Sequence, residues 1–483
     1  MKIDSPEAYI ESMRGLKRRI YLLGDRVDNA VDHPMIRPSM NAMAETYNLG
    51  NEAEADELLF CRSHLGGGKI SRFTHIHQDT DDLVNKVLMQ RLLGRRTSTC
   101  FQRCVGMDGF NALYSVTYEC DQDHGTEYHE RLKEYLRHVQ EDNVVVDGAM
   151  TDVKGDRNLR PSEQVDPDLF LHVVERRPDG IVVRGAKAHQ TGALNSHEIL
   201  VMPTTAMRED EGDYAVSFAV PATAEGITFV LGRQPSDTRK MEGSPMDVGN
   251  PVFGSQEALI IFDDVFVPWE QVFMCGEIDQ SGKVVERFAS YHRQSYGGCK
   301  VGVGDVLIGA AQLAATYQGV DRASHVRDKI TEMIHLNETL FSCGIACSSR
   351  GSATPSGCYM VDPLLANVCK HNVTRFPFEI ARLLQDIGGG LVVTMPSEKD
   401  FENPEVAPYL EKYLQGKSGI STMDRMKIIR FIENMTVGCG AAAYLTESIH
   451  GAGSPQAQRI MISRLGNLPE KVRYAKKLAG IDD

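Results

Sequence analysis

The 483-residue chain lacks long hydrophobic runs and an excess of positive charge. Apolar stretches such as residues 258–262 have the length of a strand, whereas a membrane-spanning helix needs about 18 or more apolar residues. Lys and Arg number 52 against 66 Asp and Glu, so the formal charge is −14, opposite to what a phosphate-backbone binder needs. We therefore expect neither a membrane nor a nucleic acid among its partners.

The N-terminal residues lack the basic segment and apolar run of a secretory signal, and we expect a cytoplasmic protein. Cytosolic thiols are kept reduced, so the 11 cysteines are expected to be core residues, metal ligands or nucleophiles rather than a disulfide framework. A hydrophobic content of 42% and a charged content of 24% are typical of a folded soluble enzyme. The length allows about two to four domains.

Apolar periodicity divides the chain into three parts. Helical spacing runs over residues 5–27, 82–93 and 128–139, then gives way to short β-branched runs separated by Gly, Pro and Asp, and returns after about residue 305. The pattern predicts an α+β protein: an N-terminal α domain (1–142), a central antiparallel β domain (143–276) and a C-terminal helical bundle (277–483). Residues 396–421 show no readable pattern.

Two separated segments carry candidate metal ligands. Cys100 and Cys104 are four residues apart and share a face if they lie on a helix; His292 and Cys299 share one if a helix continues through the intervening Gly297-Gly298. Together they form a Cys3His set that fits structural zinc or an iron–sulfur cluster, and spacing alone does not decide between the two. The alternative is that the cysteines are ordinary buried thiols. Cys343 and Cys347 have the same spacing as the first pair, and we expect them in the core.

Three further features carry polar chemistry. Residues 147–157 and 183–192 combine glycine-containing turns with Lys, Arg and hydroxyl side chains, a combination that suits a flavin and its pyrophosphate but also occurs in ordinary turns. Residues 446–455 form a glycine-rich loop before a helix, either an anion site or a plain interhelical turn. Glu257 lies beside an apolar strand and is a candidate functional acid.

Taken together, these segments resemble the flavin-dependent 4-hydroxyphenylacetate 3-hydroxylase superfamily, and within it the 4-hydroxybutyryl-CoA dehydratase branch. The resemblance covers nearly the whole chain and is weak only at about 396–421. The segments that carry it are 32–39, 100–108, 147–157, 183–192, 291–305, 375–377, 388–397 and 447–459. It implies an acyl-CoA dehydrogenase-like fold.

The resemblance also implies cofactors and site residues. The ligands of a [4Fe-4S] cluster would be Cys100, Cys104, His292 and Cys299. FAD would be bound by Met150, Thr151, Lys154, Asp156, Arg157, Gln190, Thr191, Gly388, Gly389, Gly390 and Gly451. The candidate catalytic residues are His292, Tyr296, Glu447, Glu257 and Lys300. The branch further implies an acyl-CoA substrate and a homotetramer, a dimer of dimers with FAD partly bound at a subunit interface.

The implied reaction is the radical dehydration of 4-hydroxybutyryl-CoA to crotonyl-CoA, with isomerisation of vinylacetyl-CoA. The thioester acidifies only C2, so loss of a C3 proton requires that a base first remove the C2 proton and that FAD oxidise the enolate by one electron. An iron of the cluster would accept the departing hydroxide. The alternatives are a flavin-dependent phenol monooxygenase of the same superfamily and a metal-clamped structural protein without flavin.

Overall fold

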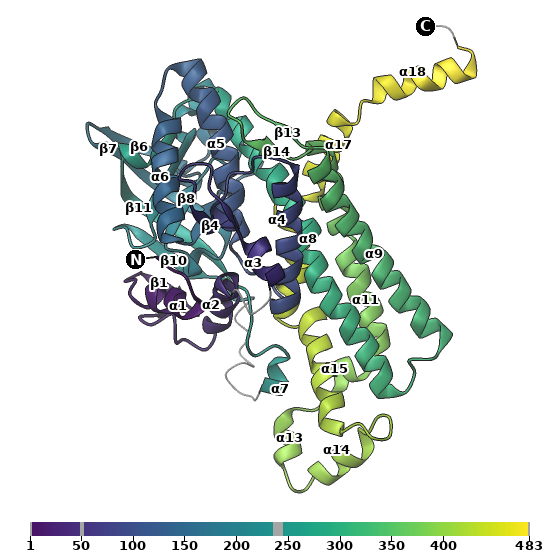
Figure 1. Cartoon of the computed structure of the whole chain (residues 1–483). Coiled ribbons are helices and arrows are strands. Elements are labelled where there is room, and N and C mark those ends of the chain that lie inside the picture. Colours follow the sequence, from purple (N-terminus) through teal and green to yellow (C-terminus); the bar gives the residue numbers. More distant parts are fainter. Residues whose placement is uncertain (1, 49–52, 235–244, 482–483) are drawn as a thin grey trace.

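The computed structural model describes residues 2–48, 53–234 and 245–481. Its N-terminal part is mainly helical, and its helices pack beside the sheets and the C-terminal bundle (Figure 1). The helices are α1 (Pro6–Arg14), α2 (Arg37–Ala44), α3 (Ala53–Leu59), α4 (Thr80–Thr97), α5 (Cys104–His124) and α6 (Tyr128–Asp142). The strands of this part are β1 (Ile20–Leu22), β2 (Asp25–Arg26), β3 (Phe60–Arg62) and β4 (Lys69–Ser71).

The helix predicted over residues 5–27 ends early. Helix α1 stops at Arg14, and β1 pairs in parallel with β10 (Ile227–Leu231). Within β1, Ile20 and Leu22 are buried and Tyr21 is less so, a two-residue alternation that fits a strand. Sheet pairing has overridden the helical spacing here, and the N-terminal segment contributes to the β structure.

Two sheets form the central part. The remaining strands are β5 (Val146–Ala149), β6 (His172–Arg177), β7 (Gly180–Thr191), β8 (Glu198–Val201), β9 (Val216–Pro221), β11 (Glu257–Pro268) and β12 (Val272–Cys275). The six-stranded sheet has the order β2-β1-β10-β11-β7-β6 and the four-stranded sheet β12-β9-β8-β5. The predicted antiparallel arrangement holds for most pairs, but β1–β10 and β5–β8 are parallel.

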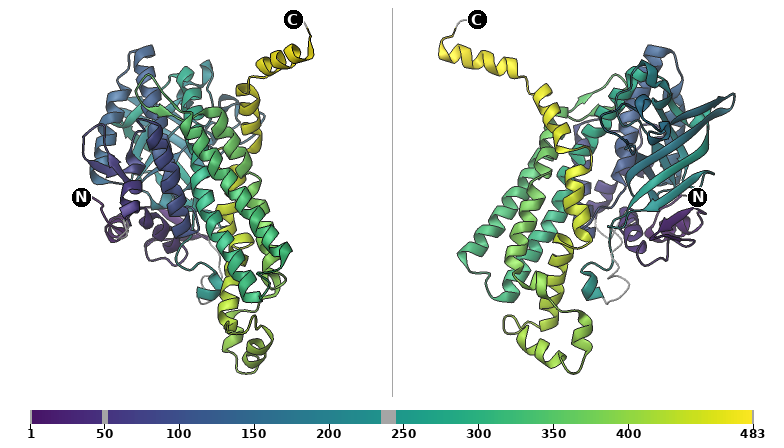
Figure 2. Two further views of the ribbon diagram at one scale, coloured as in Figure 1. Left: turned by 45° about the vertical axis from the view of Figure 1, so that its right-hand side comes forward. Right: turned by 180° about the vertical axis from the view of Figure 1, so that it is seen from behind.

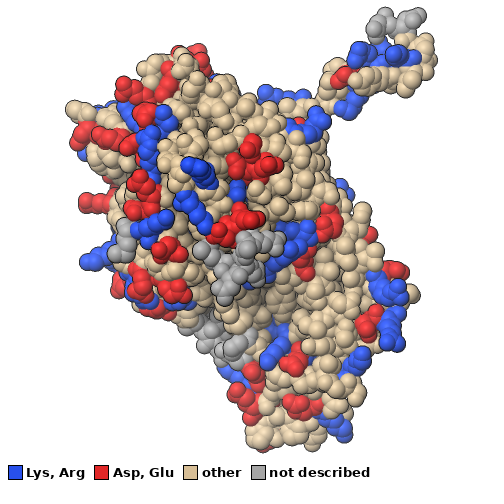
Figure 3. All heavy atoms as spheres, viewed as in Figure 1, with Lys and Arg blue, Asp and Glu red and all other residues tan. Residues whose placement is uncertain are grey.

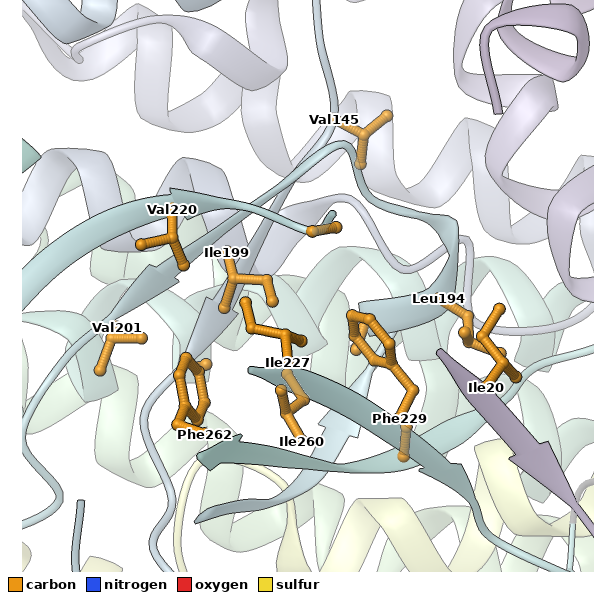
Figure 4. Close-up of a cluster of buried hydrophobic side chains, with 14 of the residues drawn as sticks. Ile20, Val145, Leu194, Ile199, Val201, Val220, Ile227, Phe229, Ile260 and Phe262 are labelled. Carbon is orange, nitrogen blue, oxygen red and sulfur yellow. The ribbon is translucent and has the colours of Figure 1, made fainter. Parts of the chain in front are cut away.

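The main core lies between the two sheets. Phe262 of the larger sheet meets Phe218 of the smaller one, with ring centroids 6.2 Å apart. Figure 4 shows Ile199, Val201 and Val220 of the smaller sheet above Ile260 and Phe262 of the larger. Burial of these side chains removes apolar surface from water and fixes the strands that lead into the polar site.

The C-terminal part is a helical bundle around α8 (Figures 1 and 2). Its larger helices are α8 (Ile278–Gln318), α9 (Ser324–Ser349), α10 (Pro363–Val373), α11 (Phe376–Gly388), α15 (Thr422–Thr436), α17 (Pro455–Leu465) and α18 (Leu468–Ala479). Shorter elements are α7 (Pro245–Val248), β13 (Ser352–Ala353), β14 (Tyr359–Met360), α12 (Leu391–Thr394), α13 (Glu398–Glu402), α14 (Ala407–Tyr413), a π-helical turn (Ala442–Thr446) and α16 (Glu447–His450). The unreadable stretch 396–421 contains α13 and α14.

Helix α8 is continuous over 41 residues. It runs through Gly297 and Gly298, where the sequence did not decide whether a helix would continue. By length and composition it would also pass as a membrane span, yet most of that stretch is buried within the protein. The glycines permit close contact with α4: a Cβ on Gly298 would lie 2.5 Å from the carbonyl oxygen of Val87, and one on Gly94 would lie 2.6 Å from that of Cys299.

Charged side chains of both signs are interspersed over the surface. The face in Figure 3 carries Lys and Arg next to Asp and Glu over the helical and sheet parts alike. This distribution agrees with the acidic composition and offers no support, on the face shown, for a basic stripe that would follow a nucleic acid.

Candidate functional site

The predicted metal ligands come from three neighbouring elements. Cys104 is the first residue of α5, whereas His292 and Cys299 lie on α8, two turns apart. Cys100 lies in the loop between α4 and α5, so the condition under which Cys100 and Cys104 would share a helix face is not met. Ligand atoms of Cys104, Asp108 and His292 lie within 4.8 Å of one another.

The three thiols influence one another electrostatically; Cys104 is buried, and Cys100 and Cys299 are partly buried. Burial raises the pKa of Cys100 well above its usual value, and the charges of Glu447, Cys104 and Cys299 raise it further. Burial also raises the pKa of Cys104, again with a contribution from Cys299, and raises that of Cys299 to about 11. Without a metal these groups are neutral thiols, and a bound cation would favour the thiolates.

The ligand atoms of one subset lie especially close together. Across the described ranges, Cys104, Asp108 and His292 make up the one group of three or more potential ligands whose atoms all lie within 4.8 Å. The charges of Cys104 and Cys299 act on Cys100, and that of Cys299 acts on Cys104. Thiols and an imidazole in one neighbourhood are donors for zinc or for an iron–sulfur cluster.

The loop that carries Cys100 is held by its neighbour Gln102. The Gln102 side-chain amide donates to the carbonyl oxygens of Cys100 at 3.2 Å and Gly254 at 3.4 Å. Its own oxygen accepts from the Asn195 amide at 2.8 Å. A Cβ on Gly192 would lie 2.8 Å from the Cβ of Gln102, so the end of β7 presses directly on this loop.

A close backbone contact joins α5 to the sheet. A Cβ on Gly148 of β5 would lie 2.7 Å from the carbonyl oxygen of Val105. The two main chains can approach only because this position is a glycine. As a result Cys104 lies beside the strand that leads into the predicted flavin contacts Met150 and Thr151.

The proposed proton-handling residues are close together. Lys300 Nζ donates to Glu447 Oε2 at 2.8 Å and to the carbonyl oxygen of Ala443. Burial alone would lower the pKa of Lys300, but the charges of Glu447, Cys299 and Cys100 outweigh it and the pKa is raised. Tyr296 is buried against this pair, and its hydroxyl has no hydrogen-bond partner among the described residues. A Cβ on Gly451 would overlap its hydroxyl oxygen.

Glu257 faces the same region from the sheet. It lies opposite Thr191 in the β7–β11 register, and the Thr191 hydroxyl donates to its carboxylate at 2.7 Å. Burial raises the pKa of Glu257 well above its usual value, and the charge of Glu447 raises it further. Both effects favour the protonated form of the Glu257 carboxyl.

The predicted FAD residues fall into two groups. Met150, Thr151 and Gln190 are joined at the sheet, since the Gln190 amide donates to the Thr151 carbonyl oxygen at 3.4 Å and the carbonyl oxygen of Met150 accepts from Lys187 at 2.9 Å. Lys154, Asp156 and Arg157 continue this segment outward, and Asp156 and Arg157 are exposed. By contrast, Gly388, Gly389 and Gly390 close α11 in the helical bundle, and Gly451 contacts Tyr296.

Three buried charged residues at the site, Asp108, Lys86 and Lys370, were not predicted from the sequence. Asp108 bonds to both Lys86 and His292. Lys370 donates to the carbonyl oxygen of Ser448 at 2.5 Å and lies 4.8 Å from the Tyr296 ring; burial lowers its pKa to about 7, with the charge of Lys300 adding to the effect. Asp108 follows Cys104 by four residues, a spacing that could have identified it; Lys86 and Lys370 lie on other helices and gave no such signal.

A pocket reaches the loop that carries Cys100. It is lined by residues from three segments. These are Ser98, Thr99, Asn250, Phe253, Gly254, Ser255, Asn434, Met435, Cys439 and Gly440.

Comparison with known proteins identifies the family to which the chain is similar over nearly its whole length. Family models of the N-terminal and C-terminal parts of 4-hydroxyphenylacetate 3-hydroxylase match residues 5–274 and 281–480. The chain is 58% identical to a 4-hydroxybutyryl-CoA dehydratase/vinylacetyl-CoA-Delta-isomerase of Clostridium aminobutyricum, over 98% of this chain and 99% of that one.

Solved structures extend the comparison to the fold. An oxygen-tolerant archaeal 4-hydroxybutyryl-CoA dehydratase from N. maritimus superposes with a TM-score of 0.98 at 56% identity, covering 100% of this chain and 96% of that one. The oxygenase component of 4-hydroxyphenylacetate 3-monooxygenase, in complex with FAD and 4-hydroxyphenylacetate, gives 0.83 at 25% identity over 98% of each chain. Glutaryl-coenzyme A dehydrogenase gives 0.50 at 13% identity over 82% of each chain, which agrees with the predicted acyl-CoA dehydrogenase-like fold.

Proposed function

Because the chain belongs to the 4-hydroxyphenylacetate 3-hydroxylase family, we propose that it dehydrates 4-hydroxybutyryl-CoA to crotonyl-CoA and isomerises vinylacetyl-CoA, using FAD and a [4Fe-4S] cluster. The observation that carries the proposal is the convergence of Cys100, Cys104, Cys299 and His292 beside the Lys300–Glu447 pair. A phenol hydroxylase that uses flavin and oxygen has no need for such a thiol set.

The donor chemistry fits the cluster. Three thiols and one imidazole are competent iron ligands, and the charges of Cys104 and Cys299 both act on Cys100, so the three thiols lie near one another. Cys100, Cys104, His292 and Cys299 would hold the cluster, and its iron would serve as a Lewis acid for a substrate hydroxyl.

The sheet residues fit the flavin. Burial lowers the pKa of Lys154, and the positive charge of Arg157 lowers it further, so two cations lie close to each other. Such a pair suits a diphosphate. Met150, Thr151, Asp156, Gln190 and Thr191 would surround the rest of the cofactor, and in the proposed homotetramer Gly388–Gly390 would reach it from a neighbouring subunit.

In this proposal FAD and the cluster supply redox and Lewis-acid chemistry, and the protein side chains transfer protons. When bound, FAD supplies a reversible one-electron oxidation and the cluster supplies a Lewis-acidic iron. The protein handles the protons: His292 accepts the C2 proton, and the Lys300–Glu447 pair holds charge and protons beside Tyr296. Glu257, whose pKa is raised by burial and by Glu447, is a candidate proton donor from the side of the sheet.

Analysis of the protein purified without oxygen tests the proposal. We expect about four iron and four sulfide per chain together with FAD. Oxygen uptake with reduced flavin and a phenol would instead indicate the monooxygenase reaction. A colourless protein that contains zinc and no flavin would indicate a structural metal site.

A further inference from the structure

A buried pair of charges lies behind His292, on the side of Nδ1. The Nδ1 atom of His292 is 2.8 Å from Asp108 Oδ2, and Asp108 Oδ1 is 2.5 Å from Lys86 Nζ. The side chains of Lys86 and Asp108 are both 0% exposed. Helices α4, α5 and α8 each contribute one member, so the row of contacts joins the three elements that carry or flank the thiols.

Every group bonded to Asp108 is a donor. Lys86 is an ammonium that also donates to the Tyr291 carbonyl oxygen at 3.0 Å, and the Ser295 hydroxyl donates to Asp108 Oδ2 at 3.1 Å. A carboxylate paired with an ammonium only accepts hydrogen bonds. The third bond therefore has the hydrogen on Nδ1 of His292, which leaves a lone pair on Nε2.

The ring of His292 is also fixed in orientation. It stacks on Phe288 with centroids 5.6 Å apart and planes 14° apart, and it meets the edge of Tyr296 at 5.4 Å. Contacts on the ring face and edge restrict rotation about χ2, while Asp108 determines which nitrogen carries hydrogen.

We propose that Asp108, with its charge balanced by Lys86, is a positioning residue that holds His292 in the tautomer whose Nε2 is free to bind metal or accept a proton. This inference rests on the proposed function, because it assigns a role to residues behind one of the proposed ligands. Carboxylates commonly take this place behind metal-binding histidines. Lys86 keeps the carboxylate from being an unpaired buried charge.

The substitution Asp108→Asn tests the pair. An amide can donate to Nδ1 and stabilise the other tautomer, so the protein purified without oxygen should lose iron to excess chelator faster. The expected change corresponds to the roughly 10- to 100-fold loss of metal affinity usual for such partners. The matched control is Asp305→Asn: Asp305 on α8 also pairs with a cation of α4, Arg91 at 2.8 Å, without contacting His292. Its iron release should stay at the wild-type rate.

A double substitution shows whether Asp108 acts through the imidazole. In a His292→Cys background, Asp108→Asn should leave the release rate unchanged. Nitrogen hyperfine couplings of the imidazole in the reduced cluster should differ between Asp108→Asn and wild type, and Asp108→Glu, which keeps the carboxylate, should restore iron retention. Two results would overturn this inference and leave the proposed function standing. One is iron release and nitrogen couplings in Asp108→Asn equal to those of the wild type; the other is that Asp108→Asn accelerates iron release equally with His292 and with Cys at position 292. Wild-type protein without iron would overturn the proposed function as well.

Discussion

Iron binding should depend on three thiols, those of Cys104, which is buried, and of Cys100 and Cys299, which are partly buried. We expect each Cys→Ala variant to lose iron, because a missing thiolate opens the ligand set to water. Cys347→Ala and Cys343→Ala are the controls, since Cys347 is buried on α9 and outside this set. Iron and sulfide assays on anaerobic preparations measure the difference, and unchanged iron in all three ligand variants would refute the assignment.

A substitution of Glu447 can separate the effect on proton transfer from the effect on cofactor binding. Glu447→Gln should leave iron and FAD in place and lower kcat, because the amide keeps the shape but cannot exchange a proton. Glu119→Gln is matched to it, since the Glu119 side chain is also 17% exposed and also pairs with a lysine of α8, Lys283. Turnover in Glu447→Gln equal to that in Glu119→Gln would exclude a role for Glu447.

His292 is proposed both to bind iron and to accept the C2 proton, and a substitution can separate these roles. His292→Cys should keep the cluster, because thiolate binds iron, yet lose dehydration and isomerisation together. Exchange of the C2 hydrogen with deuterated solvent is the measurement. Exchange at the wild-type rate in iron-loaded His292→Cys would show that another residue, Glu447 first among them, removes the C2 proton.

For single residues, the sequence identified the site side chains that belong to a recognisable spacing. It did not identify those that reach the site from helices elsewhere in the chain. Cys104 and His292 stand in readable spacings. Lys86 and Lys370 become relevant only because α4 and α10 pack against α8. The four-residue spacing of Cys100 and Cys104 would put them on one face of a helix, but the chain turns at Gln102, which adopts a positive φ of 67°.

The α4–α8 contact is the element-scale feature that places Cys299. Gly94→Ala would bring a Cβ to 2.6 Å from the Cys299 carbonyl oxygen, and overpacking of this kind costs about 1–3 kcal/mol. We expect a lower melting temperature and reduced iron content. Gly309→Ala on α8, where a Cβ would meet no atom within 4 Å, should instead be neutral or stabilising by roughly 0.5–1 kcal/mol. Equal melting temperatures and iron contents would contradict this role of the glycine contact.

Strands and amphipathic helices were largely predictable because their periodicity reflects burial. The helical spacings at 82–93 and 128–139 lie within α4 and α6, and the strand-length run at 258–262 lies within β11. Two elements were missed for physical reasons. The first half of α8 is buried almost all round and so lacks a single apolar stripe, and β1 is a three-residue strand stabilised by pairing with β10.

At the scale of the whole molecule, α18 is a helix that packs against no other part of the described chain. It extends away from the body (Figure 2), none of its residues is buried, and Leu468, Val472 and Leu478 are 65%, 47% and 89% exposed. A second copy of the chain is the partner that the predicted homotetramer supplies. Because apolar burial drives subunit association, Leu478→Asp should lower the mass in light scattering.

The control for α18 is Val165→Asp, because Val165 is 97% exposed in the sheet part of the chain and should tolerate the charge. A tetramer of unchanged mass in Leu478→Asp would exclude α18 from the interface. A wild-type monomer with full FAD occupancy would contradict the shared flavin site itself.

The most direct test of the central claim is a turnover assay without oxygen. Purified protein is mixed with 4-hydroxybutyryl-CoA, and the thioesters are separated and quantified with time. We expect crotonyl-CoA to form without added oxidant or reductant, and vinylacetyl-CoA to be converted by the same preparation. A protein that contains both FAD and the cluster but leaves 4-hydroxybutyryl-CoA unchanged would contradict the proposed dehydration.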